Sequence, residues 1–218
     1  MIQVTIIGSS PSGISHHKAE MLYQFGLTDE CEGTVTFDSI EMNITTHSSD
    51  ISVAESLNKY PYSRCDERKD EYQTTDLSES IYVRKYSSMP SFINSLQYLA
   101  MLYIEAASYI DYTDDKWTLY TLHVKQTNEL VGFSTVYRFF KFPQGIRARI
   151  SQFLIIPNFQ RLGYGSMLYK NILSDLSNDA DVKELTVESP AESFIRMKIR
   201  VDSRRVGTKA ESLLSPRD

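Results

Sequence analysis

Residues 153–169 read FLIIPNFQRLGYGSMLY: an apolar run, a turn with two glycines, and a segment with the apolar spacing of a helix. Gly163 and Gly165 let the chain adopt positive φ angles and let backbone N–H groups approach a bulky partner. Because the first N–H groups of a helix are unpaired and its dipole favours anions, the turn predicts a phosphate site. A tight strand-to-helix turn with nothing bound is the alternative for a Gly-x-Gly taken alone.

Strands and helices are expected on both sides of this turn. Four stretches that alternate in polarity or are wholly apolar predict strands, the first two as an antiparallel hairpin: KWTLYTLHV (116–124), LVGFSTVYRFF (130–140), RARISQFLII (147–156) and KELTVES (183–189). Three stretches with apolar residues every three or four positions predict helices: 90–110, 164–176 and 191–201. This order predicts one mixed α/β domain.

The first ninety residues carry weaker signals. TVTF (34–37) and IEMNIT (40–45) alternate with period two and are expected to be strands. Residues 59–80 are polar and charged, so we expect a surface loop or a short helix there. No internal repeat is present in the sequence.

Composition favours a soluble intracellular protein without a structural metal. Of the 218 residues, 41% are hydrophobic and 11% aromatic, which is enough for a core. The longest apolar stretch, residues 96–104, is too short to span a bilayer, and the start of the chain lacks the basic region of a signal peptide. The two cysteines, Cys31 and Cys65, are too few for a zinc site or a disulfide framework.

Charge is divided unevenly between the two halves of the chain. Residues 1–115 carry 7 Lys and Arg against 18 Asp and Glu, a net charge of −11, whereas residues 116–218 carry 16 against 10, a net charge of +6. The difference predicts that the first half meets a basic partner and the second half an anionic one. An anionic partner agrees with a phosphate at the glycine turn.

A Gln-x-x-Gly-x-Gly turn between a strand and a helix, followed by a strand that ends in an acid, resembles the GNAT fold of N-acetyltransferases. Within that superfamily the chain resembles the catalytic subunits of type B histone acetyltransferases, the Hat-one family. Four segments carry the resemblance: LYIEAASYIDYTDDKW (102–117), LVGFSTVYRFF (130–140), RARISQFLIIPNFQRLGYGSMLY (147–169) and LTVESPAESF (185–194).

The resemblance implies an α/β fold with a mixed sheet (α+β) and a small, mostly-β amino-terminal domain that binds substrate. We therefore expect an acidic substrate-binding domain at residues 1–87, an acetyltransferase domain at 88–202 and a polar tail at 203–218. Members of the family continue with a helical carboxyl-terminal domain, so the chain is expected to be a carboxyl-terminally shortened relative.

Acetyl-CoA is the co-substrate that the resemblance implies, and no metal is implied. The loop at 160–166 would surround its pyrophosphate with N–H groups, and the helix that follows would direct its positive end toward it. The strand before the loop would pair its backbone with the pantetheine arm while its side chains stay in the core. The expected contacts are Phe153, Leu154, Ile155, Gln160, Arg161, Leu162, Gly163, Tyr164, Gly165, Ser166, Ala191 and Arg200.

Glu188 is the expected general base, because a carboxylate at the end of a strand beside the cofactor can take a proton from an acceptor amine. The resemblance makes Glu105, expected on a helix, a second acid at the lysine channel. For either residue, a solvated surface charge is the alternative. The family usually has Glu-Asp-Pro where this chain has Glu188-Ser189-Pro190, which leaves Glu105 as the assisting acid. Without a cysteine near the cofactor motif, direct attack in a ternary complex is expected.

The resemblance places Trp117, the only tryptophan, at the substrate, although a lone Trp is more often a core residue. Asp111, Asp114 and Asp115, with acids from the amino-terminal segment, would line a groove for a Lys/Arg-rich tail. The implied acceptor is the N-terminal tail of newly made histone four, and an implied partner is a β-propeller histone chaperone subunit. We expect the nucleus and cytoplasm as location, without direct DNA binding or membrane association.

Two other functions remain open from the residues alone. An N-acetyltransferase for a different basic acceptor, such as a polyamine or a protein N-terminus, would use the same fold and the same acidic surface. A non-catalytic histone-binding scaffold would keep the fold without the reaction.

Overall fold

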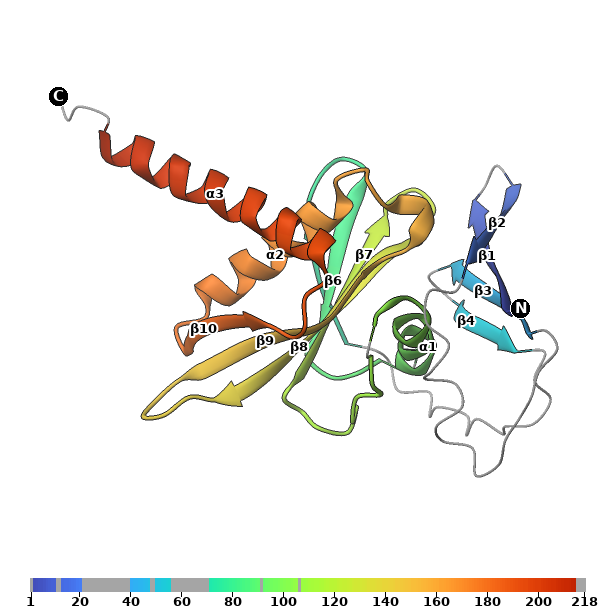
Figure 1. Cartoon of the computed structure of the whole chain (residues 1–218), viewed down its shortest axis with the longest axis horizontal. Coiled ribbons are helices and arrows are strands. Elements are labelled where there is room, and N and C mark those ends of the chain that lie inside the picture. The colour runs from blue at the N-terminus through green and yellow to red at the C-terminus, as the bar shows by residue number, and fades with distance from the viewer. Residues whose placement is uncertain are drawn as a thin grey trace.

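The computed structural model describes residues 2–10, 13–20, 40–47, 50–55, 71–90, 92–105 and 107–214. Side chains are described between residues 71 and 204, apart from positions 91, 95, 98 and 106. Within these residues the chain forms two β-sheets and three α-helices (Figure 1).

A four-stranded sheet is formed by the first strands, in the order β2-β1-β3-β4 (Figure 1). They are β1 (Ile2–Ser10), β2 (Gly13–Glu20), β3 (Ile40–His47) and β4 (Asp50–Glu55). β1 is antiparallel to β2 and parallel to β3, and β3 is antiparallel to β4. The strand expected at 40–45 is confirmed as β3, whereas the one expected at 34–37 lies outside the described residues.

A six-stranded sheet in the order β10-β9-β8-β7-β6-β5 forms the body of the protein. Its strands are β5 (Gln73–Asp76), β6 (Ile81–Tyr86), β7 (Trp117–Val124), β8 (Leu130–Phe140), β9 (Ile146–Ile155) and β10 (Val182–Val187). All neighbours in this sheet are antiparallel except β9 and β10, which are parallel. The four strands expected after residue 115 are thereby confirmed, including the hairpin of β7 and β8.

The six-stranded sheet extends across the domain boundary expected at residue 87. β6 pairs with β7 from Ile81 to Tyr86, and β5 pairs with β6 at the edge of the sheet. The interpretation of residues 59–80 as surface loop or short helix is wrong at β5, and residues 59–70 lie outside the described residues. All four residues of β5 are exposed, so the strand has no apolar face that sequence periodicity could reveal.

The helices cover the two faces of this sheet. α1 (Ile93–Tyr103) packs on one face, and α2 (Tyr164–Asn178) and α3 (Glu192–Leu214) pack on the other (Figure 1). The α1 side is filled by residues that include Leu96, Leu99, Leu119, Phe133 and Leu154. The opposite side is filled by residues that include Tyr120, Leu122, Ile150, Leu168 and Ile172. None of the described helices combines the length and apolarity needed to cross a bilayer.

α1 is shorter than the apolar spacing indicates. The helix was expected to continue to Ile110, but it ends at Tyr103, and Ile104 has the extended angles φ −113° and ψ 120°. Ile110 is nevertheless buried in the same cluster as α1, where its backbone N–H donates to the side chain of Gln97 at 2.6 Å. A buried loop residue thus continued the apolar spacing that the sequence shows for α1.

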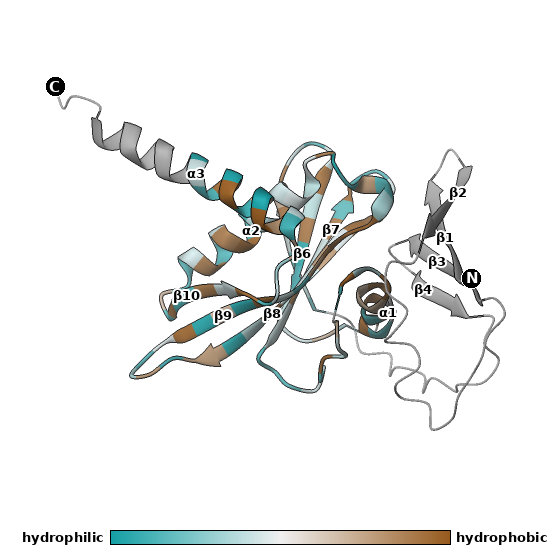
Figure 2. Cartoon of the chain, in the orientation of Figure 1, coloured by the Kyte–Doolittle hydropathy of each residue, from teal (hydrophilic) through white to brown (hydrophobic). Residues whose placement is uncertain are grey.

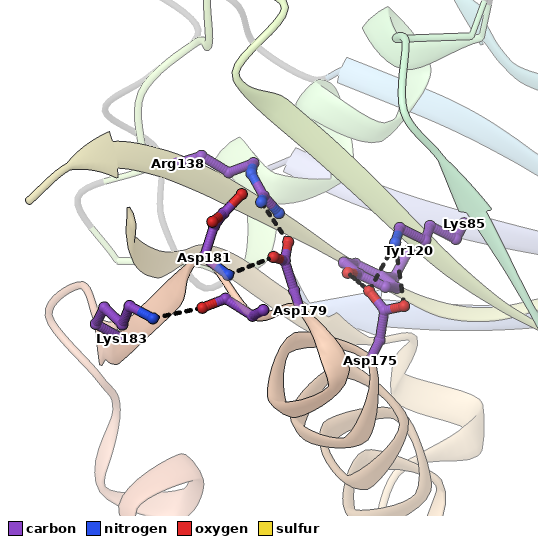
Figure 3. A network of polar contacts seen from close by, with 8 residues as sticks. Lys85, Tyr120, Arg138, Asp175, Asp179, Asp181 and Lys183 are labelled. Carbon is purple, nitrogen blue, oxygen red and sulfur yellow. Dashed lines mark hydrogen bonds and ion pairs between the residues drawn. The ribbon is translucent and has the colours of Figure 1, made fainter. Parts of the chain in front are cut away.

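Polar contacts fix α2 against the sheet (Figure 3). Asp175 of α2 accepts a hydrogen bond from the Tyr120 hydroxyl at 2.6 Å and forms an ion pair with Lys85 at 2.8 Å. Asp179, which caps the end of α2, is paired with Arg138 of β8. Burial, followed by the hydrogen bond to Asp175, raises the pKa of the Tyr120 hydroxyl, so it remains a donor at neutral pH. The contacts of Asp175 and Asp179 together hold α2 in one position on the sheet.

α3 is longer than the helix expected at 191–201. It runs through Leu214 and includes most of the segment expected to be a polar tail. Phe194 and Val201 are buried, whereas Ile195 and Ile199 are exposed, so the described part of α3 presents both hydrophobic and hydrophilic residues (Figure 2). Residues after 202 lack an apolar stripe but include good helix formers, whose propensity is not visible in periodicity.

Candidate functional site

The strands β9 and β10 run side by side for only part of their lengths. β10 pairs with β9 from Ile146 to Ile150, and the N–H of Glu188 then donates to the carbonyl oxygen of Ile150 at 2.9 Å. Beyond that bond β10 has ended, whereas β9 continues to Ile155. Residues 151–155 therefore have β8 on one side and no described strand on the other. We call this point of separation the fork.

Ser151 forms a β-bulge at the fork. Thr135 of β8 is paired with Gln152, but the next residue, Val136, is paired with Ile150, so Ser151 is an extra residue in β9. Bulges bend a strand and redirect a side chain, and they are common beside active sites.

Alternate residues of the open edge direct their backbone groups outward. The N–H of Ile156 donates to the carbonyl oxygen of Val131 on β8 at 2.9 Å. In an antiparallel ladder, residues bonded to the neighbouring strand alternate with residues that are not. Leu154 therefore bonds to β8, whereas Phe153 and Ile155 face the open edge with their N–H and C=O groups. Of the three residues expected to pair with a ligand, these two have suitable backbone directions.

The turn after β9 is closed by Gln160. Its side-chain amide donates to the outward carbonyl oxygen of Ile155 at 2.8 Å, so Gln160 has a structural role in the turn. Arg161 and Gly163 then adopt positive φ angles of 64° and 90°. A Cβ atom at Gly163 would meet nothing within 4 Å, which means that the loop faces open space.

The two glycines of the loop serve different purposes. Gly163 is the N-cap of α2 and offers no side chain to the N–H groups of the first turn, which have no acceptor within the helix. At Gly165, a Cβ atom would lie 3.3 Å from Sδ of Met197 and 3.5 Å from Cγ1 of Ile155. Gly165 thus permits α2 to pack closely on β9 and α3. The open space and free N–H groups at Gly163 fit a phosphate group.

Glu188 directly follows β10 and lies at the fork. Its carboxylate accepts a hydrogen bond from the Ser151 hydroxyl at 2.5 Å and lies 3.8 Å from the guanidinium of Arg149. Its side chain is 47% exposed. Ser189 follows with a φ of 35°, in the left-handed region that residues other than glycine seldom adopt. A carboxylate so placed is accessible to an amine that arrives from solvent.

Glu105 does not lie on a helix, contrary to the expectation. It is exposed in the turn just after α1, because α1 ends at Tyr103. The connection from α1 to β7, residues 104–116, begins with this turn, and we call it the strap; Ala106 within it is not described.

Two buried glutamines hold the strap. Oε1 of Gln97 on α1 accepts a hydrogen bond from the N–H of Ile110 at 2.6 Å, and Nε2 of Gln152 on β9 donates to the carbonyl oxygen of Ser108 at 3.1 Å. Both side chains are almost fully buried, where an unbonded amide would be costly. This role of the two glutamines was not predicted from the sequence. The available signal was a single Gln inside each of two apolar runs.

The acidic residues of the strap are bonded within it and to β8. The Asp111 carboxylate accepts hydrogen bonds from the hydroxyl and N–H of Thr113 at 2.6 and 3.0 Å, and these bonds lower its pKa. The Asp114 carboxylate accepts from the N–H of Lys116 at 3.0 Å and the hydroxyl of Tyr137 at 2.8 Å, which lower its pKa in that order. Both carboxylates are thereby held in their charged form.

An aromatic row crosses the sheet between the strap and the fork. Trp117, Tyr137 and Phe139 have neighbouring ring centroids 4.7 and 4.5 Å apart, and the guanidinium of Arg149 lies 4.5 Å from the Phe139 ring. Trp117, Tyr137 and Arg149 are direct cross-strand partners on β7, β8 and β9. Asp115, which precedes Trp117 by two residues in the sequence, is exposed. Trp117 was predicted from the sequence, but Tyr137 and Arg149 were not, because their position beside it depends on the strand register.

The remaining expected contacts lie on the loop, on α2 and near α3. Arg161 and Leu162 are exposed, and Tyr164 and Ser166 on α2 are half-buried. Ala191 precedes α3 and is exposed, as is Arg200 within the helix. Among the described side chains, no group of three or more His, Cys, Asp and Glu residues could hold a metal ion.

A model of the acetyltransferase (GNAT) family matches residues 88–197, which is half of the chain. The chain belongs to the acetyltransferase (GNAT) family. The match begins just before α1 and ends in α3, so it includes the strap, the fork, the loop and Glu188. The expected fold class, a mixed-sheet α/β fold of the GNAT type, is thereby confirmed.

Curated relatives of the chain include catalytic subunits of type B histone acetyltransferases, as the sequence resemblance predicted. The one from Kluyveromyces lactis is 39% identical over 126 residues, which cover 52% of this chain and 32% of that protein. The one from Schizosaccharomyces pombe is 38% identical over 117 residues, which cover 51% of this chain and 31% of that protein. The chain thus spans about a third of the length of these GNAT relatives.

Solved structures of acetyltransferases match at lower similarity. An aminoglycoside acetyltransferase from an uncultured soil metagenomic sample has a TM-score of 0.42 and 15% identity, covering 66% of this chain and 93% of that one. A possible acetyltransferase from Clostridium difficile 630 has a TM-score of 0.45 and 15% identity, covering 58% of this chain and 90% of that one.

Proposed function

We propose that the chain is a lysine N-acetyltransferase that transfers the acetyl group of acetyl-CoA to a basic peptide, the N-terminal tail of free, newly made histone four. The observation that carries the proposal is the fork, where Glu188 stands between the open edge of β9 and the aromatic row. Membership of the GNAT family supports the reaction class, and the names of the relatives support the acceptor.

The donor would lie along the open edge of β9 and end at the start of α2. The loop at 160–166 would hold its pyrophosphate, because Gly163 leaves open space in front of unpaired N–H groups, and Arg161 adds positive charge there. The outward backbone of Phe153 would pair with the pantetheine arm as a neighbouring strand would. Acetyl-CoA would supply the acetyl group as a thioester.

Glu188 would act as the general base for the acceptor amine. A lysine ammonium has a pKa of about 10.4, so its deprotonation at pH 7 costs about 5 kcal/mol. A carboxylate within reach of the amine, directly or through one water, can take this proton while the amine attacks. Glu105 at the start of the strap would assist, since Ser189 replaces the family's usual second acid.

The acceptor lysine would approach along the aromatic row. The methylene groups of a lysine side chain can pack on the faces of Trp117 and Tyr137, and an ammonium is attracted to such rings. Asp111, Asp114 and Asp115 of the strap would supply negative charge to the rest of a basic tail. We further propose that the acidic segment 1–87 adds to this substrate-binding surface.

Transfer would be direct, within a complex of enzyme, donor and acceptor. The described residues contain no cysteine, because Cys31 and Cys65 both lie outside them. In the sequence neither cysteine lies near residues 153–166, so no thiol is expected there to carry an acyl group. We also propose a β-propeller histone chaperone subunit as a partner and the nucleus and cytoplasm as the location, as the relatives' class suggests.

The proposal is tested by acetyl transfer to three acceptors at equal concentration: a histone-four tail peptide, a peptide whose lysines are all replaced by norleucine, and spermidine. The tail peptide is expected to be the best acceptor and to be modified on lysine side chains, as mass spectrometry would show. Glu188→Gln should bind acetyl-CoA normally and lower kcat by about 10²–10⁴-fold. Glu105→Gln should lower it less.

Different acceptor patterns separate the competing functions. Preference for spermidine, or acetylation of the norleucine peptide at its N-terminus, would favour an N-acetyltransferase for another amine. Binding of the tail peptide without any transfer, with or without acetyl-CoA binding in calorimetry, would favour a scaffold. Glu188→Gln running at the wild-type rate at pH 7 would remove Glu188 as the base.

A further inference from the structure

We propose that Ser151 is a positioning residue for Glu188: its hydroxyl, redirected by the bulge in β9, holds the carboxylate that serves as the base. The inference rests on the proposed function. It is based on two contacts of Glu188, one with Ile150 and one with Ser151, which are consecutive residues of β9.

Neighbouring residues of β9 hold the backbone and the side chain of Glu188. The carbonyl oxygen of Ile150 accepts a hydrogen bond from the N–H of Glu188 at 2.9 Å, which fixes where β10 ends. The hydroxyl of Ser151 donates to Oε2 of Glu188 at 2.5 Å. A glutamate side chain that is about half exposed would otherwise exchange among several rotamers, at an entropic cost when it is ordered. Ser151 restricts it before an acceptor arrives.

The bulge is what makes this contact available. Ile150 packs on the α2 side of the sheet, and Gln152, only two residues later, bonds to Ser108 on the α1 side. In a regular strand, residues two apart face the same side, so the extra residue at Ser151 reverses the alternation. Ser151 itself has no register partner on β8, and its hydroxyl is free to reach Glu188.

Arg149 is the other charged neighbour of this carboxylate, and it serves less well as a positioning group. Its guanidinium lies 3.8 Å from Oε1 of Glu188, beyond hydrogen-bond distance, and it is stacked over the Phe139 ring. The charge of Arg149 attracts the Glu188 carboxylate but does not fix its orientation. The Ser151 hydroxyl supplies a directional hydrogen bond, which fixes the position of Oε2 of Glu188.

Kinetics of three variants test the role. Ser151→Ala is expected to lower kcat about tenfold with an unchanged KM for acetyl-CoA, because a hydrogen bond to a charged group is lost. Ser151→Thr keeps the hydroxyl and should stay within about twofold of the wild type. Thr186→Val is the matched control, since the Thr186 hydroxyl bonds to the backbone of Ala148 and not to Glu188.

Two further measurements separate this inference from the proposed function. In a Glu188→Gln background, Ser151→Ala should change kcat by less than about twofold, because the base that Ser151 positions is gone. Carbon-13 NMR relaxation of the Glu188 side chain, which needs no activity, should show greater mobility in Ser151→Ala and unchanged mobility in Thr186→Val. If Glu188→Gln is slow but Ser151→Ala matches the wild type in rate and in the mobility of the Glu188 side chain, the inference is wrong and the function stands. If no acceptor is acetylated but the Glu188 side chain becomes more mobile in Ser151→Ala, the contact stands and the function is wrong.

Discussion

Gln152 on β9 donates a side-chain hydrogen bond to the carbonyl oxygen of Ser108 in the strap, 3.1 Å away. Gln152 lies next to the bulge residue Ser151, in the open edge of β9 that is proposed to bind the donor. Its buried side chain therefore joins this edge to the strap, which is proposed to bind the acceptor. A change at this position is therefore expected to act on the acceptor without a direct contact to it.

Gln152→Met should raise the KM of the peptide acceptor several-fold while the affinity for acetyl-CoA stays unchanged. Methionine keeps the volume but leaves the Ser108 carbonyl unbonded, which costs about 1–3 kcal/mol. Steady-state kinetics with both substrates and a thermal melt would check this. Gln144→Met, at an exposed residue of the hairpin tip, is the control. An equal loss of affinity for both substrates would contradict a strap-specific role.

Charge reversal at Leu162 should reveal an anion at the loop. Leu162 is 64% exposed, so Glu and Lys at this position have similar structural effects. Leu162→Glu should weaken acetyl-CoA binding about three- to tenfold at low salt, and Leu162→Lys should not weaken it. Calorimetric titrations at two salt concentrations would measure the difference. Equal affinities for the two variants would place the pyrophosphate away from residues 160–166.

Stability should fall in mild acid because of His123. Burial, followed by the charge of Arg84, lowers the pKa of His123 to about 3, and its ring bonds to Thr121 and Asn128 and stacks on Tyr82. The unfolded chain binds this proton near pH 6.5, so stability is complete above that pH and is lost as pH falls toward 3. The loss from this group between pH 8 and pH 5 is about 2 kcal/mol.

Urea unfolding of the wild type and His123→Gln across this pH range would measure the effect. The variant should be less stable at pH 8 and should lose less stability on acidification. Parallel curves for the two proteins would show that the acid sensitivity arises elsewhere.

Asp115→Asn should raise the KM of a basic peptide at low salt, and the increase should shrink at high salt. Asp115 is exposed in the strap, and an exposed charge acts over about 10 Å at 0.1 M salt. Glu79→Gln, which removes an exposed acid from the turn between β5 and β6, is the control with equal change in net charge. A salt-independent KM in the wild type would argue against an acidic groove for the acceptor.

The elements predicted most accurately are those with a complete apolar pattern. The hairpin of β7 and β8, the strand β9, the helix α2 and the glycine loop all lie within a few residues of their expected bounds. Their alternation or helical spacing is strong because each buries one face in the core. β5 has no buried residue, so no pattern could indicate it.

The features missed within the site depend on register and on burial from loops. The pairing of Trp117 with Tyr137 and of Tyr137 with Arg149 is invisible until strands are aligned, and a one-residue bulge at Ser151 shifts that alignment. The expected helix reached Ile110 because Ile110 is apolar at helical spacing. In the structure Ile110 lies in the strap, where its N–H donates to the side chain of Gln97 on α1. Glu105 was consequently assigned to a helix that ends before it.

β9 and β10 are the parallel pair of the six-stranded sheet, and α2 is the connection between them. Parallel neighbours need such a crossover, so the route from Ile150 to Glu188 passes through the loop at 160–166. The length of this route is fixed at both ends by the sheet and in its middle by the contacts of Asp175 and Asp179. Insertions in this stretch should therefore be poorly tolerated. Insertions at the exposed hairpin tip between β8 and β9, residues 142–144, should be accepted, which makes that tip a suitable place for an inserted tag.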